Sequence, residues 1–217
     1  MIFDFDALTP ANRYKLITAS VVPRPIAWVV TQDAEGALNA APFSFFNVFS
    51  NDPATLIFGI GAAPGGEAVH GATKDTLANI KALGQFTVCL VGEDNAKAMN
   101  VTAIDFPPQV DELAEAGLTT APSSRVSVPR IAESPVAIEC ETMQIIPMGH
   151  HNLVLGKIVA MHIKDECVLN PERCHVDTQK LGIIGRLGAG NVYLRTTEDI
   201  FHLDRISKND WQAKTGD

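Results

Sequence analysis

Extended apolar runs stand toward both ends of this 217-residue chain, and helical spacing is confined mainly to its middle. Strand-like runs occupy residues 26–31, 38–46, 55–60, 86–91, 136–143, 151–163 and 191–196. Helical pieces are expected at 10–16, 77–83, 94–103 and 110–116. A doubly wound fold needs strands and helices in alternation, and that alternation is missing. The pattern therefore predicts a mainly β protein, an antiparallel sheet or barrel with a few peripheral helices.

Residues 26–46 have the form of a β-hairpin. β-Branched and aromatic residues fill 26–31, Asp33–Gly36 supplies turn residues, and an extended run follows from Leu38 to Phe46. Pro42 removes one backbone donor from this second run. The stretch must therefore be an edge strand, a bulge or a place where the backbone faces something other than a strand.

The composition is that of a soluble globular protein, with 46% hydrophobic and 19% charged residues. The formal net charge is −8 and no basic block stands out, so no nucleic-acid surface is expected. No apolar run approaches the ~20 residues that span a bilayer. Asp4 and Asp6 stand where a secretory signal would be basic and then apolar, which predicts a cytoplasmic protein. We expect a single domain over 1–217, with an N-terminal extension (about 1–20) and a C-terminal tail (about 204–217).

The cysteines do not follow a common structural zinc pattern. Cys89 lies in the apolar run 86–91 and is expected to be a buried thiol. A zinc site could be imagined from four residues, His162, Cys167, Cys174 and His175. Their spacing favours reduced thiols and no metal site.

Two stretches near the N-terminus have features of a ligand site. The proline after Arg24 fixes the backbone and partly preorganises the guanidinium for an anion; the alternative is a surface arginine followed by a core tryptophan, Trp28. In 39–47, Ser44 and Asn47 bring donors and acceptors into a run with three phenylalanines. That mixture suits a flat heterocycle, although a core strand with outward polar residues explains it too.

Three later stretches could complete such a site. Lys74-Asp75-Thr76 opens the helical run, where free N–H groups and a lysine suit a phosphate, although plain capping explains Asp75 and Thr76. His150 and His151 start a strand, so only one of them can face a given pocket; a single exposed or structural histidine is the alternative. Residues 186–193 contain glycines that let a loop lie against a ligand. They match no dinucleotide fingerprint, so a nicotinamide nucleotide would not use a Rossmann domain.

Together these stretches resemble the flavin reductase-like family, which includes flavoredoxin-type proteins. The resemblance covers roughly residues 14–195. Its motifs are, in order, SVVPRPIAWV at 20–29, NAAPFSFFN at 39–47, Asp52-Pro53, KDTLANI at 74–80 and HNLVLGKI at 151–158. The insertion-like, glycine-bearing stretch 59–71 departs from the pattern and leaves the loop before Lys74 uncertain.

The resemblance implies a six-stranded antiparallel split barrel of Greek-key form, usually a homodimer with FMN at or near the subunit interface. It places Ala41, Phe43, Ser44 and Asn47 along the flavin ring and ribityl chain, and Arg24, Lys74 and Thr76 at the phosphate. Trp28 would shield part of the ring, His151 would lie near it, and Arg186 would come from the C-terminal loop. The full expected set is Arg24, Trp28, Ala41, Pro42, Phe43, Ser44, Asn47, Lys74, Asp75, Thr76, Asn79, His151 and Arg186.

The leading functional hypothesis is an FMN-dependent oxidoreductase that takes a hydride from NADH or NADPH and passes electrons to an acceptor. An oxygenase or an electron-transfer protein would be its partner. Hydride transfer to a flavin requires no side chain as acid or base, so no catalytic residue is assigned; His151 is the one candidate. The alternatives are an FMN electron carrier that never meets a nicotinamide, and a flavin-storage or structural protein on the same scaffold.

Overall fold

A computed structural model describes residues 1–61, 75–107, 110–206 and 211 of the chain. Seven antiparallel strands form the main sheet: β1 (Ala27–Gln32), β2 (Leu38–Phe43), β3 (Phe46–Asn51), β4 (Ala54–Gly61), β5 (Gln85–Leu90), β8 (Val136–Met148) and β9 (His151–Ile163). Three two-stranded sheets are formed by β6 (Thr120–Ala121) with β7 (Arg130–Ile131), β10 (Val168–Asn170) with β11 (His175–Val176), and β12 (Ile184–Leu187) with β13 (Val192–Arg195). The helices are α1 (Pro10–Ser20), α2 (Asp75–Leu83), α3 (Ala96–Val101) and α4 (Glu112–Glu115), with short 3-10 turns at Glu93–Asn95 and Asp165–Cys167.

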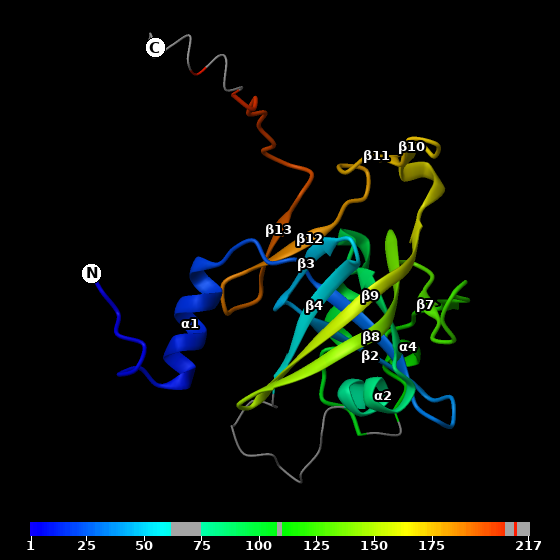
Figure 1. The fold of residues 1–217 in the computed structure, drawn as a ribbon, viewed down its shortest axis with the longest axis horizontal. Coiled ribbons are helices and arrows are strands. Elements are labelled where there is room, and N and C mark those ends of the chain that lie inside the picture. The colour runs from blue at the N-terminus through cyan, green and yellow to red at the C-terminus, as the bar shows by residue number, and fades with distance from the viewer. Residues whose placement is uncertain (62–74, 108–109, 207–210, 212–217) are drawn as a thin grey trace.

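The main sheet closes on itself at a corner between β2 and β3. Its strand order is β2-β1-β5-β8-β9-β4-β3, so β2 and β3 are the two edges although only Ser44 and Phe45 separate them in the chain. The sheet must therefore curl until its edges meet at this corner, which makes a split barrel (Figure 1). Across the split, the rings of Phe43 on β2 and Phe58 on β4 lie 5.5 Å apart between centroids.

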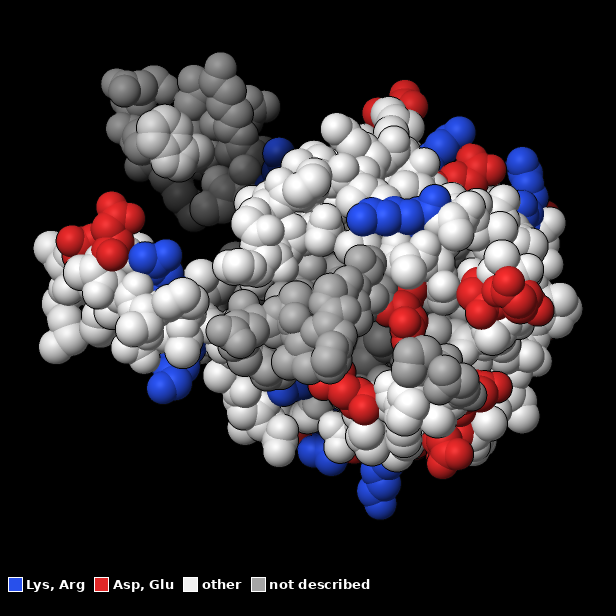
Figure 2. All heavy atoms as spheres, turned by 90° about the horizontal axis from the view of Figure 1, so that it is seen from below, with Lys and Arg blue, Asp and Glu red and all other residues white. Residues whose placement is uncertain are grey.

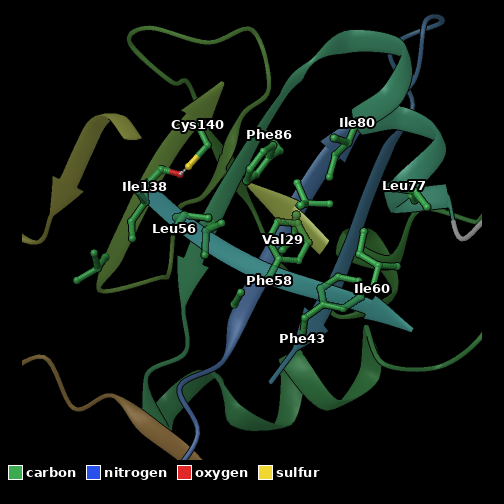
Figure 3. Close-up of a cluster of buried hydrophobic side chains, with 14 residues drawn as sticks. Val29, Phe43, Leu56, Phe58, Ile60, Leu77, Ile80, Phe86, Ile138 and Cys140 are labelled. Atoms are coloured by element: carbon green, nitrogen blue, oxygen red, sulfur yellow. Dashed lines mark hydrogen bonds between the residues drawn. The ribbon is translucent and has the colours of Figure 1, made fainter. Parts of the chain in front are cut away.

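Side chains alternate along β1 between two apolar clusters. Ala27 and Val29 face the barrel interior, whereas Trp28 and Val30 face an outer cluster that includes Met99 of α3. Aromatic and aliphatic residues from β2, β4, β5 and β8 fill the interior, and side chains of α2 cover one end of it (Figure 3). The core therefore occupies both faces of β1.

The structure confirms a mainly antiparallel β fold and the expected hairpin, in which Trp28 pairs with Pro42. The main sheet contains seven strands rather than the six expected, and the run 38–46 is two strands because the chain turns at Ser44 and Phe45. Three short strands, β10, β11 and β12, lie within residues 168–190, where no strand-like run is expected, and β12 is the longest of them. It is only four residues long and ends beside a glycine turn, so its apolar pattern is too short to recognise.

The N-terminal residues with α1, and the segment after β13, project from the body on different sides (Figure 1). Large apolar side chains remain uncovered on both: Phe3 is 50% exposed, Phe201 82% and Leu203 87%. Among the described helices, none is long and apolar enough to cross a membrane. The cytoplasmic location and the single-domain boundaries remain predictions.

Candidate flavin site

The corner between β2 and β3 combines apolar and polar groups near the surface. Ala41 and Pro42 are half-buried, and Phe43 is buried against the barrel interior. Ser44 is half-buried, and its hydroxyl oxygen accepts a 3.5 Å hydrogen bond from Arg24 Nε. Asn47 is exposed, and its Oδ1 accepts from the backbone N–H of Val48 at 2.8 Å. This is the mixture of surfaces that a flat heterocycle with polar edges requires.

Arg24 is a structural clamp at this corner. Its side chain is only 5% exposed, and Nη1 donates to the carbonyl oxygens of Thr18 at 2.6 Å and Val21 at 3.2 Å. Nη2 donates to the carbonyl of Gly188 at 2.8 Å. The guanidinium thus ties the end of α1 to the β12–β13 turn. Because most of its donors are engaged, Arg24 has little capacity left for direct contact with a phosphate, which revises its expected role.

Arg186 lies beside Arg24. The two residues exchange backbone hydrogen bonds of 2.8 and 3.0 Å, in an isolated β-bridge between the segment before β1 and β12. The Arg186 guanidinium donates to the Tyr193 hydroxyl at 3.1 Å and to the Gly190 carbonyl at 3.0 Å, and it sits 5.1 Å from the centre of the Tyr193 ring. Two sequence candidates that are 162 positions apart are therefore brought together.

Neither arginine pairs with a carboxylate among the described residues, where Asp and Glu form ion pairs only with His162 and Arg195. Burial lowers the pKa of Arg24; the nearby Tyr14 opposes this effect and the charge of Arg186 adds to it. Two adjacent cations with no carboxylate partner in the described part of the chain make the corner locally positive, although the chain carries a formal charge of −8.

The first turn of α2 lies at the other end of β2. Thr76 is 1% exposed, and its hydroxyl donates to Asn39 Oδ1 at 2.8 Å. Asn39 is the second residue of the strand, and Ser44 follows its last residue. Five residues of extended chain span about 16 Å. Arg24 and Thr76 therefore cannot bind the same phosphate. The expectation that both residues lie at one phosphate site is revised.

A hydrogen-bonded network fixes α2 against β1 and β2. Asn79 donates to the Thr31 hydroxyl at 3.1 Å, and Asn39 donates to Glu112 Oε1 at 2.6 Å. Burial raises the pKa of Glu112, although hydrogen bonds from its own backbone N–H, from Asn39 and from the Ala40 N–H oppose the rise. Thr76 and Asn79 thus direct their side chains inward, and α2 would offer a ligand its backbone N–H groups. Glu112 was not singled out in the sequence, because a carboxylate in a polar stretch carries no local sign of burial.

The remaining candidates take different positions. Trp28 is fully buried, and its indole N–H donates to the Thr102 hydroxyl at 2.9 Å, so it does not shield a ligand at the surface. Asp75 is exposed at the start of α2. His151 is exposed at the start of β9, and its ring lies over Gly61, where an added Cβ would come within 2.9 Å of Nε2. Lys74 lies outside the described residues.

Figure 2 views the molecule from the end where α2 lies. On this face, single Lys and Arg side chains are interspersed with Asp and Glu, without a broad basic surface. Among the residues that the structure describes, no three His, Cys, Asp or Glu side chains come together as a metal site. Cys89, Cys140 and Cys167 are buried free thiols, and burial raises the pKa of Cys89 to about 11. Cys174, also a free thiol, is exposed.

Comparisons with known proteins agree with this architecture. A 42% identical relative from Deinococcus radiodurans aligns over 98% of this chain and 92% of its own length, and YwrF of Bacillus subtilis is 36% identical over 91% and 96%. The 2-nitrobenzoate 2-nitroreductase NbaA of Pseudomonas fluorescens is 35% identical, with a TM-score of 0.84 over 96% of this chain and 98% of its own. Component B of nitrilotriacetate monooxygenase from Bacillus cereus is 30% identical, with a TM-score of 0.84 over 94% and 98%.

A Shewanella frigidimarina protein with a split barrel domain shares the fold at 19% identity, with a TM-score of 0.78 over 95% of this chain and 100% of its own. The model of the flavin reductase like domain matches residues 19–175, which include the β2–β3 corner, α2 and the start of β9. The chain therefore belongs to the flavin reductase-like family of split-barrel flavoproteins.

Proposed function

We propose that this protein binds FMN at the β2–β3 corner and reduces it with NADH or NADPH, passing the electrons to an acceptor. Membership of the flavin reductase-like family supports a flavin and a nicotinamide donor in general. The observation that carries the choice of site is the segment Ala41–Ser44, half-buried except for the buried Phe43, beside two arginines that lack a carboxylate partner among the described residues. The positive charge of the two arginines and the apolar side chains of the segment together fit an anionic ligand with a flat apolar ring.

The residues divide into two groups in this proposal. Ala41, Pro42 and Phe43 supply the apolar surface for the ring, and Ser44 and Asn47 supply polar groups for its edge. The first turn of α2, with Lys74 before it, holds the phosphate at the far end of β2. A bound flavin supplies the hydride-accepting chemistry, and the chain supplies orientation and charge. His151 keeps its place as a candidate neighbour of the flavin.

The visible spectrum tests the proposal directly. FMN-loaded protein mixed anaerobically with NADH or NADPH should lose its flavin absorption within seconds. Fast reduction by a ferredoxin-type donor, without any reaction with either nicotinamide, would favour the electron carrier instead. Protein that neither is yellow nor takes up FMN would contradict both functions.

Replacing Lys74 by alanine should weaken FMN binding about ten- to a hundredfold and leave riboflavin binding nearly unchanged. Only FMN carries the phosphate, and a charge-assisted contact contributes about 1.5–3 kcal/mol. Titration of flavin fluorescence measures both affinities. Lys81→Ala, at the exposed far end of the same helix, is the matched control. An equal loss for both flavins would move the phosphate to another part of the chain.

We further propose a homodimer. The uncovered apolar side chains of the N-terminal residues and of the segment after β13 support this, because such side chains usually mark an interface. Light scattering should give twice the mass of the chain, and Phe201→Ser with Leu203→Ser should shift the mass toward the monomer. A wild-type mass equal to that of one chain would exclude the dimer.

An oxygenase component is the acceptor that we propose. Component B of nitrilotriacetate monooxygenase is similar to this chain over nearly its full length, which supports a two-component arrangement. A nitroaromatic acid is a second candidate acceptor, favoured by NbaA together with the cationic corner, which suits a carboxylate. Oxidation of the reduced protein by 2-nitrobenzoate under anaerobic conditions would distinguish the two.

A further inference from the structure

Arg24 and Arg186 form a cationic pair whose position suggests a role other than binding the phosphate. The Arg24 side chain is 5% exposed, and placing a charge there without an ionic partner costs free energy. Backbone carbonyls of Thr18, Val21 and Gly188 solvate it but carry no net charge. The pair therefore remains able to attract an anion at the corner.

The corner and the phosphate candidates lie at opposite ends of β2. Arg24 Nε reaches Ser44, just past the C-terminal end of the strand, whereas Thr76 is bonded to Asn39 near its start, about 16 Å away along the chain. If FMN lies along β2 with its phosphate at α2, the pair faces the ring end of the cofactor. This step rests on the flavin site proposed above.

We propose that Arg24 and Arg186 form an electrostatic site that stabilises the negative charge gained by the flavin ring on two-electron reduction. A hydride from a dihydronicotinamide carries two electrons and one proton to N5 of the ring, and the donor leaves as the oxidised nicotinamide. The ring then bears one negative charge until a second proton arrives from solvent. Positive charge beside the ring favours that reduced form over the neutral oxidised form.

The two arginines differ in how strongly the surrounding structure depends on them. Arg24 is fixed by four hydrogen-bond acceptors and holds the corner in place, so replacing it would also loosen α1 and the β12–β13 turn. Arg186 is half-buried and donates two side-chain hydrogen bonds, to Tyr193 and Gly190. Arg186 is therefore the residue whose charge can be removed with the smaller disturbance.

The test is the midpoint potential of bound flavin, measured by equilibration with a reference dye and dithionite as reductant. Arg186→Gln should lower the potential by about 30 mV, which corresponds to a tenfold smaller preference for reduced over oxidised flavin. Arg186→Lys should keep the midpoint potential close to the wild-type value, because lysine keeps the positive charge. Arg195→Gln, in the strand paired with β12 but bonded to Glu93, should leave the potential unchanged.

Riboflavin separates this role from phosphate binding. The potential should fall equally with riboflavin and with FMN, while the affinity for oxidised riboflavin stays within about twofold. If Arg186→Gln weakens FMN in both oxidation states and leaves the potential unchanged, the arginine holds the phosphate and the inference is overturned. An unchanged potential with unchanged affinity overturns it as well. Failure of wild-type protein to bind flavin would instead contradict the proposed function, and the inference with it.

Discussion

Glu139→Gln is expected to lower the free energy of unfolding by about 3 kcal/mol, measured by urea denaturation near pH 7. Glu139 lies on β8 and is fully buried. Its Oε1 accepts from the backbone N–H and hydroxyl of Ser124, at 2.7 and 2.8 Å, and contacts His162 Nε2 at 2.5 Å. Its Oε2 accepts from the N–H groups of Arg125 at 2.6 Å and Val126 at 3.0 Å.

Both oxygens of Glu139 are thus surrounded by donors. An amide must place its own NH₂ group against one of these sets, which leaves at least one buried backbone N–H without an acceptor. The loop 124–126 then loses its attachment to the barrel. Glu141→Gln is the matched control, because Glu141 lies on the same strand and is exposed. A Glu139→Gln protein as stable as Glu141→Gln would show that the loop is held by other contacts.

The same carboxylate makes stability depend on pH. Burial alone would raise the pKa of Glu139, but hydrogen bonds from the Ser124 N–H, His162, the Arg125 N–H and the Ser124 hydroxyl outweigh it, and the pKa falls from 4.5 to about 2. A lowered pKa in the folded state means stabilisation that is complete above pH 4.5 and is lost as the pH falls toward 2. The shift corresponds to about 3 kcal/mol.

The stability difference between the wild type and Glu139→Gln should therefore shrink between pH 5 and pH 2. Urea denaturation at several pH values measures it, with Glu141→Gln again as the reference. A difference that stays constant over this range would mean that folding does not lower the pKa of Glu139, contrary to its donor-rich surroundings.

Local patterns predicted most of the barrel. The hairpin of β1 and β2 follows from β-branched residues around an Asp-Gly turn, and β9 follows from a long apolar run, with the bounds His151–Ile163 as expected. What local patterns cannot supply is the strand order. Because β2 and β3 are consecutive but lie at opposite edges, the turn at Ser44 is recognisable only after the sheet has closed.

The candidate site, too, was predictable only in the features that local sequence patterns decide. Pro42 indicated that its strand does not lie in the middle of a sheet, and β2 is indeed an edge strand. The sequence could not reveal that Thr76 bonds inward to Asn39, nor that Arg24 and Arg186 are neighbours. Both facts depend on contacts between residues far apart in the chain, and they decide which cation can meet which part of a flavin.

Gly156→Ala is expected to lower the free energy of unfolding by about 2–3 kcal/mol. Gly156 lies on β9 between Leu56 of β4 and Thr142 of β8. A Cβ at this position would come within 2.5 Å of Phe86 Cζ and within 3.4 Å of Cys140 Cβ and a Leu56 methyl carbon. Phe86 is fully buried, so its ring cannot move away without displacing other core side chains.

Thermal or urea denaturation measures the loss. Gly190→Ala is the matched control, because nothing lies within 4 Å of the Cβ that it would add and its backbone does not require glycine. Phe86→Leu should destabilise the wild type by leaving a cavity, yet it should recover part of the stability of Gly156→Ala by making room for the methyl group. Strictly additive effects would show that the two residues do not compete for the same space.

The clash in Gly156→Ala should also disturb the proposed flavin site. Phe86 contacts Phe58 at 5.5 Å between ring centroids, and Phe58 contacts Phe43 at 5.5 Å, so three rings connect the interior to the β2–β3 corner. A displaced Phe58 would press on Phe43, which lies in the segment where the flavin ring is proposed. Gly156→Ala should therefore weaken FMN and riboflavin equally, because the ring that both share loses its apolar support. Lys74→Ala, by contrast, should discriminate between them, so the two variants together separate the ring end of the site from its phosphate end.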